Sequence, residues 1–436
     1  MFCCAFGSSA QELAEPADPL DPSKQAGAGW EDYPMKNPIL LTVGPSGRAP
    51  DPVAVAAPTC RTGQKWCDTV QNIVARDLML SGFFKVLDPE SFIADKSTET
   101  LDQTKWEDWF NVGSKYLIKS EVEGAGKGNF VLSFRLYDVN QKKVIPLEFQ
   151  EAAVSQKQLR RAVHKFVNEV IRAITGTKGP FGGLIVYAAK TGRSSKGVFG
   201  IDVDGYGRSS LSPGDSINFL PSMSGGHLVY TSFREGKPAI YIDGKRATKD
   251  DRAYRGARIA PGGEIIAVSA DDGEGQSDIY LMDLEGNIEK NLTKHWADEV
   301  SPSWSPSGGQ IAFVSNRSGS PQIYLMGAQG GKGRRVTFAG GYNSTPDFGP
   351  DGLIVFAGMD EAHSDVFVTD LGGNITRVTQ DQGNNKDPTW SPDGRHLAFV
   401  SDRDGRWKIF VSTADGRYQF PITDKIGSFS TLFWTR

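Results

Sequence analysis

The chain has 436 residues, 39% of them apolar, and its 48 basic and 52 acidic residues leave a formal net charge of -4. This length exceeds what one hydrophobic core usually supports, so we expect two domains. The balanced charge lacks the basic excess of nucleic-acid-binding proteins, and apolar runs such as residues 184–189 are far too short to span a bilayer. We therefore expect no nucleic-acid partner and no transmembrane segment.

The N-terminus carries two segments that we do not expect to fold by themselves. Residues 1–10 are apolar or small and end in Ser-Ser-Ala, so we interpret them as a signal-peptide remnant, with an ordinary disordered terminus as the alternative. Residues 11–52 are interpreted as a flexible arm, because residues 11–38 contain five prolines among small and charged residues. A short strand-like run lies within this arm and consists of Ile39, Leu40, Leu41, Thr42 and Val43.

Cys60 and Cys67 form a pair seven residues apart. In an exported chain, such a pair predicts a local disulfide that closes a small loop. Two reduced, buried thiols are the alternative interpretation. A single Cys-x6-Cys in a chain with five histidines is poor evidence for a zinc site, so we expect no metal at this pair.

Residues 53–178 alternate between strand-like and helix-like patterns, and we expect them to form a compact α/β domain. Apolar residues recur at helical spacing between residues 159 and 174, which predicts a helix that ends at a C-cap formed by Gly176. The other predicted elements are a strand at 53–57, a helix at 69–80, a strand at 84–87, and strands at 116–122 and 130–139 joined by the glycine-rich turn 124–128.

Residues 179–436 contain six similar β-rich repeats, which predict an all-β six-bladed propeller. A proline at the same place in four repeats falls at Pro261, Pro306, Pro350 and Pro392, and these spacings of 45, 44 and 42 residues match the length of a four-stranded blade. Two eroded copies begin near residues 183 and 226. Because one blade cannot bury both of its faces, we expect neighbouring blades to stack, and we expect residues 429–434 to complete the first blade.

Three further features recur in these repeats. An Ile-Tyr or similar pair, as at residues 279–280, is interpreted as part of an inner strand of the blade. Most repeats end in Leu-Thr or Val-Thr, as at residues 292–293. Trp304 and Trp390 occupy matching positions in two repeats, which favours a packing role over a ligand platform.

The residue patterns of common catalytic and metal sites are missing from the sequence. No Gly-x-Ser-x-Gly nucleophile motif occurs, and the five histidines form no metal-binding motif. The Asp-x-Asp-Gly segments 202–205 and 402–405 lack the spacing of a calcium loop and are interpreted as tight turns. We therefore expect no enzyme activity, no cofactor and no metal.

The loops that precede the repeated proline units are expected to open on one face of the propeller, around its central channel. They are polar and aromatic, and they comprise residues 252–256, 295–300, 341–343 and 382–386. Loops on a rigid scaffold are where binding usually occurs, so these loops could form a recognition surface. Ordinary solvated loops are the alternative.

Three segments, and the order in which they follow one another, resemble the TolB family. The members of this family are periplasmic propeller proteins of the Tol-Pal envelope system. The three segments are ILLTVGPSGRAP at residues 39–50, LSGFFKVLD at 80–88, and HKFVNEVIRAITGTKGPF at 164–181, followed by the Asp-Val-Asp-Gly-Tyr of residues 202–206. The resemblance covers nearly all of residues 39–434. It implies a monomeric, non-enzymatic periplasmic scaffold that supports outer-membrane integrity, cell division and protein transport.

The resemblance also implies two partners. The propeller face would bind the peptidoglycan-associated lipoprotein Pal, and residues 39–43 would communicate with the inner-membrane protein TolA. A hydrolase or lyase that uses the propeller channel, and a carbohydrate- or peptidoglycan-binding propeller, are the alternatives. We place the Pal-binding role on five residues of the loop region: Arg255, His295, Trp296, Glu299 and Asn343.

Overall fold

The computed structural model describes residues 49–93, 99–271, 273, 275–360, 363–423 and 428–435. All of them belong to one compact unit of the chain. The signal-peptide remnant and most of the arm, including residues 39–43, lie outside the described residues. In the part described, an N-terminal α/β region is followed by six four-stranded sheets, so the predicted fold class is confirmed.

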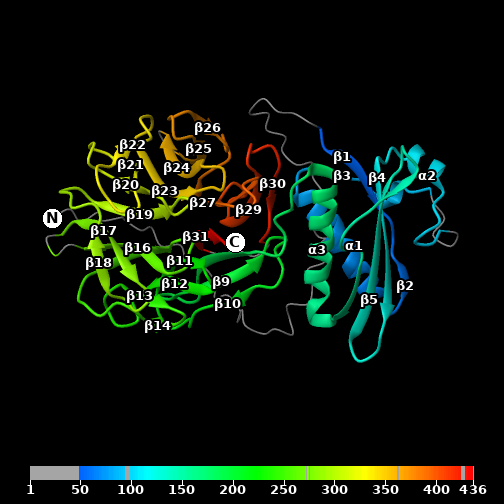
Figure 1. Cartoon of the computed structure of the whole chain (residues 1–436), viewed down its shortest axis with the longest axis horizontal. Helices are drawn as coiled ribbons and strands as arrows, with labels where there is room; N and C mark the ends of the chain where they lie inside the picture. The colour runs from blue at the N-terminus through cyan, green and yellow to red at the C-terminus, as the bar shows by residue number, and fades with distance from the viewer. Residues whose placement is uncertain are drawn as a thin grey trace. The chain divides into compact units, whose positions relative to one another are not determined.

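The α/β region is built on one mixed sheet whose strand order is β3-β1-β4-β5-β6, with β2 paired to β4 and β7 paired to β5. Figure 1 shows the two long helices, α1 and α3, side by side. The elements are β1 (Asp51–Val55), β2 (Thr59–Arg61), α1 (Gln64–Leu80), β3 (Phe84–Val86), the 3-10 helix η3 (Pro89–Ser91), α2 (Trp106–Asn111), β4 (Tyr116–Gly124), β5 (Asn129–Asp138), β6 (Lys143–Ile145), β7 (Glu151–Ser155) and α3 (Gln156–Thr175).

Helix α3 follows the predicted apolar stripe. Its buried side chains include Val163, Phe166 and Val170, which belong to the core that it shares with α1 and the sheet. A capping box between Ser155 and Gln158 starts the helix, and Gly176 ends it in a left-handed conformation with φ of 80°. The predicted C-cap is therefore confirmed. The second predicted helix, α1, begins five residues earlier than residue 69, because its N-cap is Gly63, which has no side chain that could signal the start of a helix.

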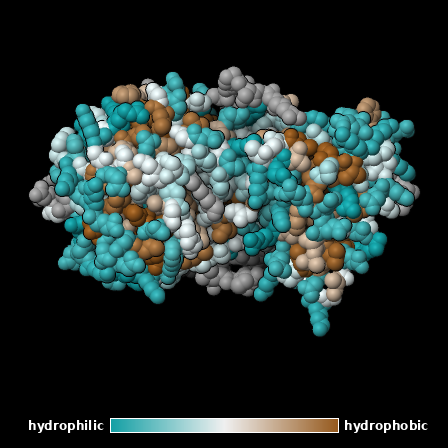
Figure 2. All heavy atoms as spheres, viewed as in Figure 1, coloured by the Kyte–Doolittle hydropathy of each residue, from teal (hydrophilic) through white to brown (hydrophobic). Residues whose placement is uncertain are grey.

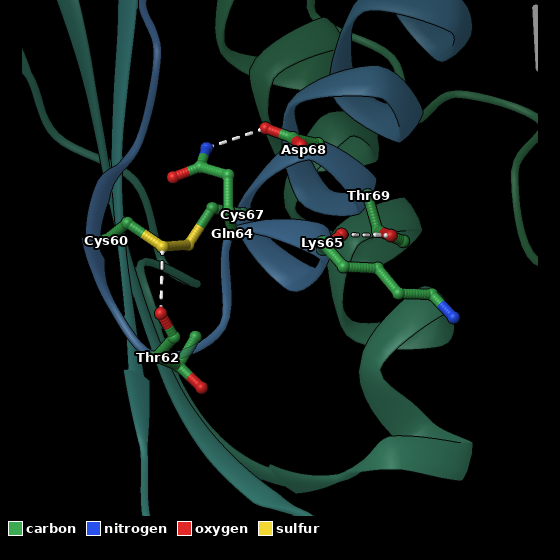
Figure 3. The surroundings of a disulfide bond; sticks show 7 residues. All are labelled: Cys60, Thr62, Gln64, Lys65, Cys67, Asp68 and Thr69. Atoms are coloured by element: carbon green, nitrogen blue, oxygen red, sulfur yellow. Dashed lines mark hydrogen bonds between the residues drawn. A yellow bond between two sulfur atoms is a disulfide. The ribbon is translucent and has the colours of Figure 1, made fainter.

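Cys60 and Cys67 are joined by a disulfide, with their sulfur atoms 2.02 Å apart. Figure 3 shows the bond linking the β2 strand to the first turns of α1. In the same turns, the Gln64 side-chain amide donates a hydrogen bond to Asp68 at 2.7 Å. The bond therefore ties the start of α1 to the sheet, next to the contact between Trp66 and Phe130, whose ring centres are 5.0 Å apart.

Each propeller blade is an antiparallel sheet of four consecutive strands, with the exception of the first blade, which has the order β10-β9-β8-β31. Blade 1 consists of β31 (Phe429–Trp434), β8 (Leu184–Lys190), β9 (Lys196–Asp202) and β10 (Ser209–Ser210). Blade 2 consists of β11 (Asn218–Ser224), β12 (His227–Ser232), β13 (Ala239–Ile242) and β14 (Lys245–Arg246), and blade 3 of β15 (Tyr254–Ile259), β16 (Ile265–Asp271), β17 (Ser277–Asp283) and β18 (Ile288–Asn291).

The remaining blades repeat the same arrangement. Blade 4 consists of β19 (Glu299–Trp304), β20 (Gln310–Ser315), β21 (Gln322–Gly327) and β22 (Arg334–Arg335), and blade 5 of β23 (Tyr342–Phe348), β24 (Ile354–Asp360), β25 (His363–Thr369) and β26 (Ile375–Arg377). Blade 6 consists of β27 (Asn385–Trp390), β28 (His396–Ser401), β29 (Lys408–Thr413) and β30 (Gln419–Pro421).

The C-terminal strand closes the ring. Strand β31 pairs antiparallel with β8, with Phe429 opposite Ala189 and Trp434 opposite Ile185. The first and last parts of the propeller sequence therefore share one sheet, as the sequence predicted.

The strands that contain the Ile-Tyr pairs are the third of four in their blades. The innermost ring around the channel consists of the first strands, and each of these contacts the first strand of the next blade. The Ile-Tyr strands are thus inside the sheets but not next to the channel.

The structure explains the Leu-Thr and Trp features of the repeats. The threonine hydroxyl oxygen accepts a hydrogen bond from the backbone N–H of the third strand, as in Thr293 to Ile279 at 3.0 Å and Thr337 to Ile323 at 2.9 Å. Trp304 is buried, and its indole N–H donates to the Arg258 carbonyl of the preceding blade at 2.9 Å. The tryptophan therefore links neighbouring blades, which agrees with the predicted packing role.

Candidate docking face of the propeller

One end of the blades carries a group of loops that we call the rim. The rim comprises the loops that precede the first strands, the turns that follow the second strands, and the strand residues within two positions of these loops and turns. Most of the exposed large apolar side chains of the propeller lie on this rim. Among the described propeller residues, the exceptions are Tyr206 and Ile375. The side chains on the rim are Ile217, Phe233, Trp296, Phe338, Tyr342 and Met359.

This concentration stands out because the protein surface is otherwise mixed. Figure 2 shows hydrophilic and hydrophobic residues interspersed over the face that it presents. Single exposed apolar residues are normal on any protein, whereas several at one end of a scaffold indicate an interaction surface. The rim can therefore provide apolar contacts to a macromolecular partner.

Of the five residues that the sequence suggested for partner binding, Arg255, His295 and Trp296 are at least partly exposed. Arg255 is exposed on β15 and lines the central cavity. Trp296 is 68% exposed, and its ring centre lies 5.3 Å from that of the half-buried His295. Burial and the nearby charge of Arg317 lower the pKa of His295, so this ring is neutral at pH 7. The rim thus offers an exposed arginine at the central cavity and, on a different loop, an uncharged aromatic pair.

The other two selected residues, Glu299 and Asn343, are buried. Glu299 is 0% exposed and accepts hydrogen bonds from Ser315 Oγ at 2.7 Å and Arg317 Nη2 at 2.8 Å. Burial raises the pKa of the Glu299 carboxyl above its usual value, although both hydrogen bonds oppose this shift. The Glu299 side chain therefore lies inside its blade, where it cannot contact a partner directly.

Asn343 has the equivalent place in the next blade. It is 3% exposed, and its amide donates to Gln322 Oε1 at 2.9 Å and to the Ala339 carbonyl at 2.8 Å. Asn385 in blade 6 repeats this arrangement by donating to Asp365 Oδ1 at 3.0 Å. These side chains connect the start of a first strand to the preceding blade or loop, so they position the rim and do not form its surface.

A recurring Ser-x-Arg at the end of the second strand supports the same ends of the blades, and it was not among the features predicted from the sequence. The guanidinium of Arg317 contacts Ser315 and Glu299, and that of Arg403 contacts Ser401 and Asn385. The available signal was the recurrence of the pattern at residues 232–234, 315–317 and 401–403.

The first strands of the six blades converge on the central channel. A cavity of about 50 Å³ lies there, and each first strand has a bulge beside it. Arg258 lines this cavity, and burial lowers its pKa despite the carboxylates of Asp347 and Asp387. The bulge residues that line it have positive φ angles and are Leu220, Gly256, Ser301, Thr345, Asp387 and Thr431.

Away from the rim, one group of described residues has the composition of a metal site. It consists of Asp77, His164 and Asp204, all of them buried. Among the helices that the structure describes, none is long and apolar enough to cross a membrane.

Comparisons with known proteins agree with this architecture. The family model for the TolB amino-terminal domain matches residues 40–145, and the model for the TolB beta propeller domain matches residues 171–361 and 341–431. A crystal structure of TolB from Acinetobacter baumannii has a similar fold, with a TM-score of 0.77 and 22% identity, covering 91% of this chain and 98% of that chain.

Curated relatives carry the same family name. A Tol-Pal system protein TolB from Desulfosudis oleivorans is 34% identical over 282 residues, which are 62% of this chain and 61% of the relative. A TolB homolog from Chlorobium chlorochromatii is 33% identical over 252 residues, which are 56% of each chain. These alignments span about three fifths of the length of the relatives. Because the family models match more than half of the sequence, from the N-terminal domain to the last blade, the chain belongs to the TolB family.

Proposed function

We propose that this protein is a periplasmic, non-enzymatic adaptor of the Tol-Pal system whose rim binds a Pal-like lipoprotein. The observation that carries the proposal is the concentration of exposed apolar side chains on the rim. A rigid ring of six sheets holds these loops in place, so little conformational entropy is lost when a partner binds. The names of the curated relatives place those proteins in the Tol-Pal system and support this choice of partner.

Within the rim, we assign direct contacts to Arg255, His295 and Trp296. Exposed tryptophan and arginine are the side chains that most often dominate the energy of protein interfaces. Trp296 projects beside a neutral histidine, so its burial by a partner would not desolvate a charge on that ring. We assign Glu299 and Asn343 a positioning role, because their side chains form hydrogen bonds inside the blades.

We further propose that residues 39–43 communicate with a TolA-like inner-membrane protein. The support comes from the sequence, because this segment lies outside the described residues. Ile39, Leu40, Leu41 and Val43 form a short apolar run in a proline-rich arm, which suits the addition of one strand to a partner's sheet. Together the two contacts would let the adaptor support outer-membrane integrity and cell division.

Binding of the full chain to a Pal-like domain from the same cell, measured by calorimetry, tests the rim assignment. Trp296→Ala should weaken binding by about 30-fold, since a central aromatic residue usually contributes 2 kcal/mol or more. Phe110→Ala is the matched control, because Phe110 is 62% exposed but lies on α2, outside the propeller. Equal losses in both variants, or no binding by the wild type, would refute the assignment.

A further inference from the structure

Three buried ionisable side chains from distant parts of the sequence meet where the α/β region contacts blade 1. Asp77 comes from α1, His164 from α3, and Asp204 from the turn after β9. All three are at least nine-tenths buried. They therefore lie between the two folded parts of the compact unit, and any change in their charge acts on this joint.

The imidazole of His164 lies between the two carboxylates. Its Nδ1 atom is 2.6 Å from Asp77 Oδ2, and its Nε2 atom is 3.8 Å from Asp204 Oδ2. Among the described residues, His164 Nε2 and Asp77 Oδ1 are buried without a hydrogen-bond partner. The ring thus has one strong contact to the α/β region and a second, longer contact to the propeller.

The charges around the ring balance when the ring itself carries a proton. The charged groups around the cluster are Asp77 on α1, Arg160 on α3, and Asp202 and Asp204 at the end of β9 and in the following turn. Arg76 on α1 joins them by donating to the Asp204 backbone carbonyl at 2.6 Å. Three carboxylates and two guanidinium groups leave one negative charge. A histidinium cancels it, whereas a neutral ring would direct its Nε2 lone pair toward the Asp204 carboxylate.

The geometry favours a proton over a metal ion. The ligand atoms of the three residues lie within 4.8 Å of one another. A shared ion would require the donor atoms to converge on one point. Asp77 and Asp204, however, contact different nitrogens of the ring, and Arg160 contacts the same Asp204 oxygen that faces His164. A positively charged guanidinium at that oxygen disfavours a second cation.

We propose that His164 is a proton-operated latch that holds the α/β region to the propeller. In its protonated form the ring bridges Asp77 and Asp204, and loss of the proton removes the bridge to the propeller. Other contacts remain in both forms, including His396 Nε2 to the Ser81 carbonyl at 2.9 Å and Arg395 Nη1 to Thr175 Oγ1 at 3.2 Å. The latch therefore adjusts the strength of the joint and does not create it.

The direction of the pH dependence follows from the surroundings of His164 and Asp77. Burial alone lowers the pKa of His164, but the charges of Asp77 and Asp204 and the hydrogen bond to Asp77 outweigh it, so the pKa is raised. Burial raises the pKa of Asp77 to about 6. Both shifts mean that the closed joint binds protons more tightly than the open joint. The added stability is present below the ordinary histidine pKa of 6.5 and is lost as pH rises through the raised pKa of His164.

Hydrogen exchange of the full chain at pH 6 and pH 8.5, corrected for intrinsic exchange rates, tests the latch. We expect α1, α3 and residues 202–207 of the wild type to lose protection by about tenfold between these two values, since linkage changes stability by up to tenfold per pH unit. The His164→Gln variant should not show this loss of protection between pH 6 and pH 8.5, which we call the step. His227→Gln should keep this loss of protection, because His227 lies on β12 in blade 2, where it pairs with Asp243 at 2.7 Å, and takes no part in the joint.

A second variant keeps the test decisive if His164→Gln fails to fold. Asp204→Asn retains the histidine and removes one of its two carboxylates, so the step should move to lower pH by about one unit. A wild type without a step, or a step that both variants retain unchanged, would overturn the proposal. Zn²⁺ that restores protection at pH 8.5 in the wild type but not in His164→Gln would overturn it in favour of a metal site.

Discussion

Truncation of the indole in Trp434→Ala should weaken the closure of the propeller ring. Trp434 is 2% exposed and packs in the core that contains Ile185 and Leu432. Its backbone N–H also donates to Thr389 Oγ1 of blade 6 at 3.2 Å, so the residue joins the first and last blades. Loss of a buried tryptophan usually costs about 3–5 kcal/mol, which is a large fraction of the 5–15 kcal/mol that stabilises a typical domain.

Urea unfolding followed by circular dichroism measures this loss. Trp296→Ala is the matched control, because it removes the same side chain from an exposed site and should change the free energy of unfolding by less than about 0.5 kcal/mol. Equal midpoints for the two variants would refute the conclusion that β31 closes the ring through its buried side chains.

Two further predictions concern local structure. Replacing both cysteines in Cys60→Ser/Cys67→Ser should lower the free energy of unfolding by about 2.5 kcal/mol, the value expected for releasing a closed loop of this length, and unchanged unfolding of the α/β region would contradict it. Gly205→Ala should cost more than about 2 kcal/mol, because φ is +85° and the new Cβ would lie 2.1 Å from the Ile422 carbonyl oxygen. Gly226→Ala has the same φ with no atom within 4 Å, so a thermal melt in which both variants lose equal stability would disprove the role of the clash.

The sequence predicted the propeller well because its signals are local and repeated. The spacing of Pro261, Pro306 and Pro350 reports blade length directly, and the Leu-Thr ending reflects one hydrogen bond that recurs in each blade, such as Thr337 to Ile323. The closing strand could be predicted because residues 429–434 remained after six repeats were counted. These features depend on residues close together in the sequence.

The candidate site was harder to predict, because exposure depends on where a loop ends. Trp296 and Glu299 are three residues apart, yet one projects from the rim while the other starts β19 and is buried against Arg317. No local pattern separates these two outcomes. The His164 cluster was missed for another reason, since its partners Asp77 and Asp204 lie 87 and 40 positions away in the sequence and meet only through the tertiary fold.

Site-specific photocrosslinking in intact cells tests the docking role of the rim most directly. A photoreactive side chain would replace Trp296 in one variant and Phe110 in the other, and the adducts would be identified by mass spectrometry. Our account predicts an adduct with a Pal-like lipoprotein from position 296 and none from position 110. A Pal-like adduct that forms from position 110 and not from position 296 would contradict it.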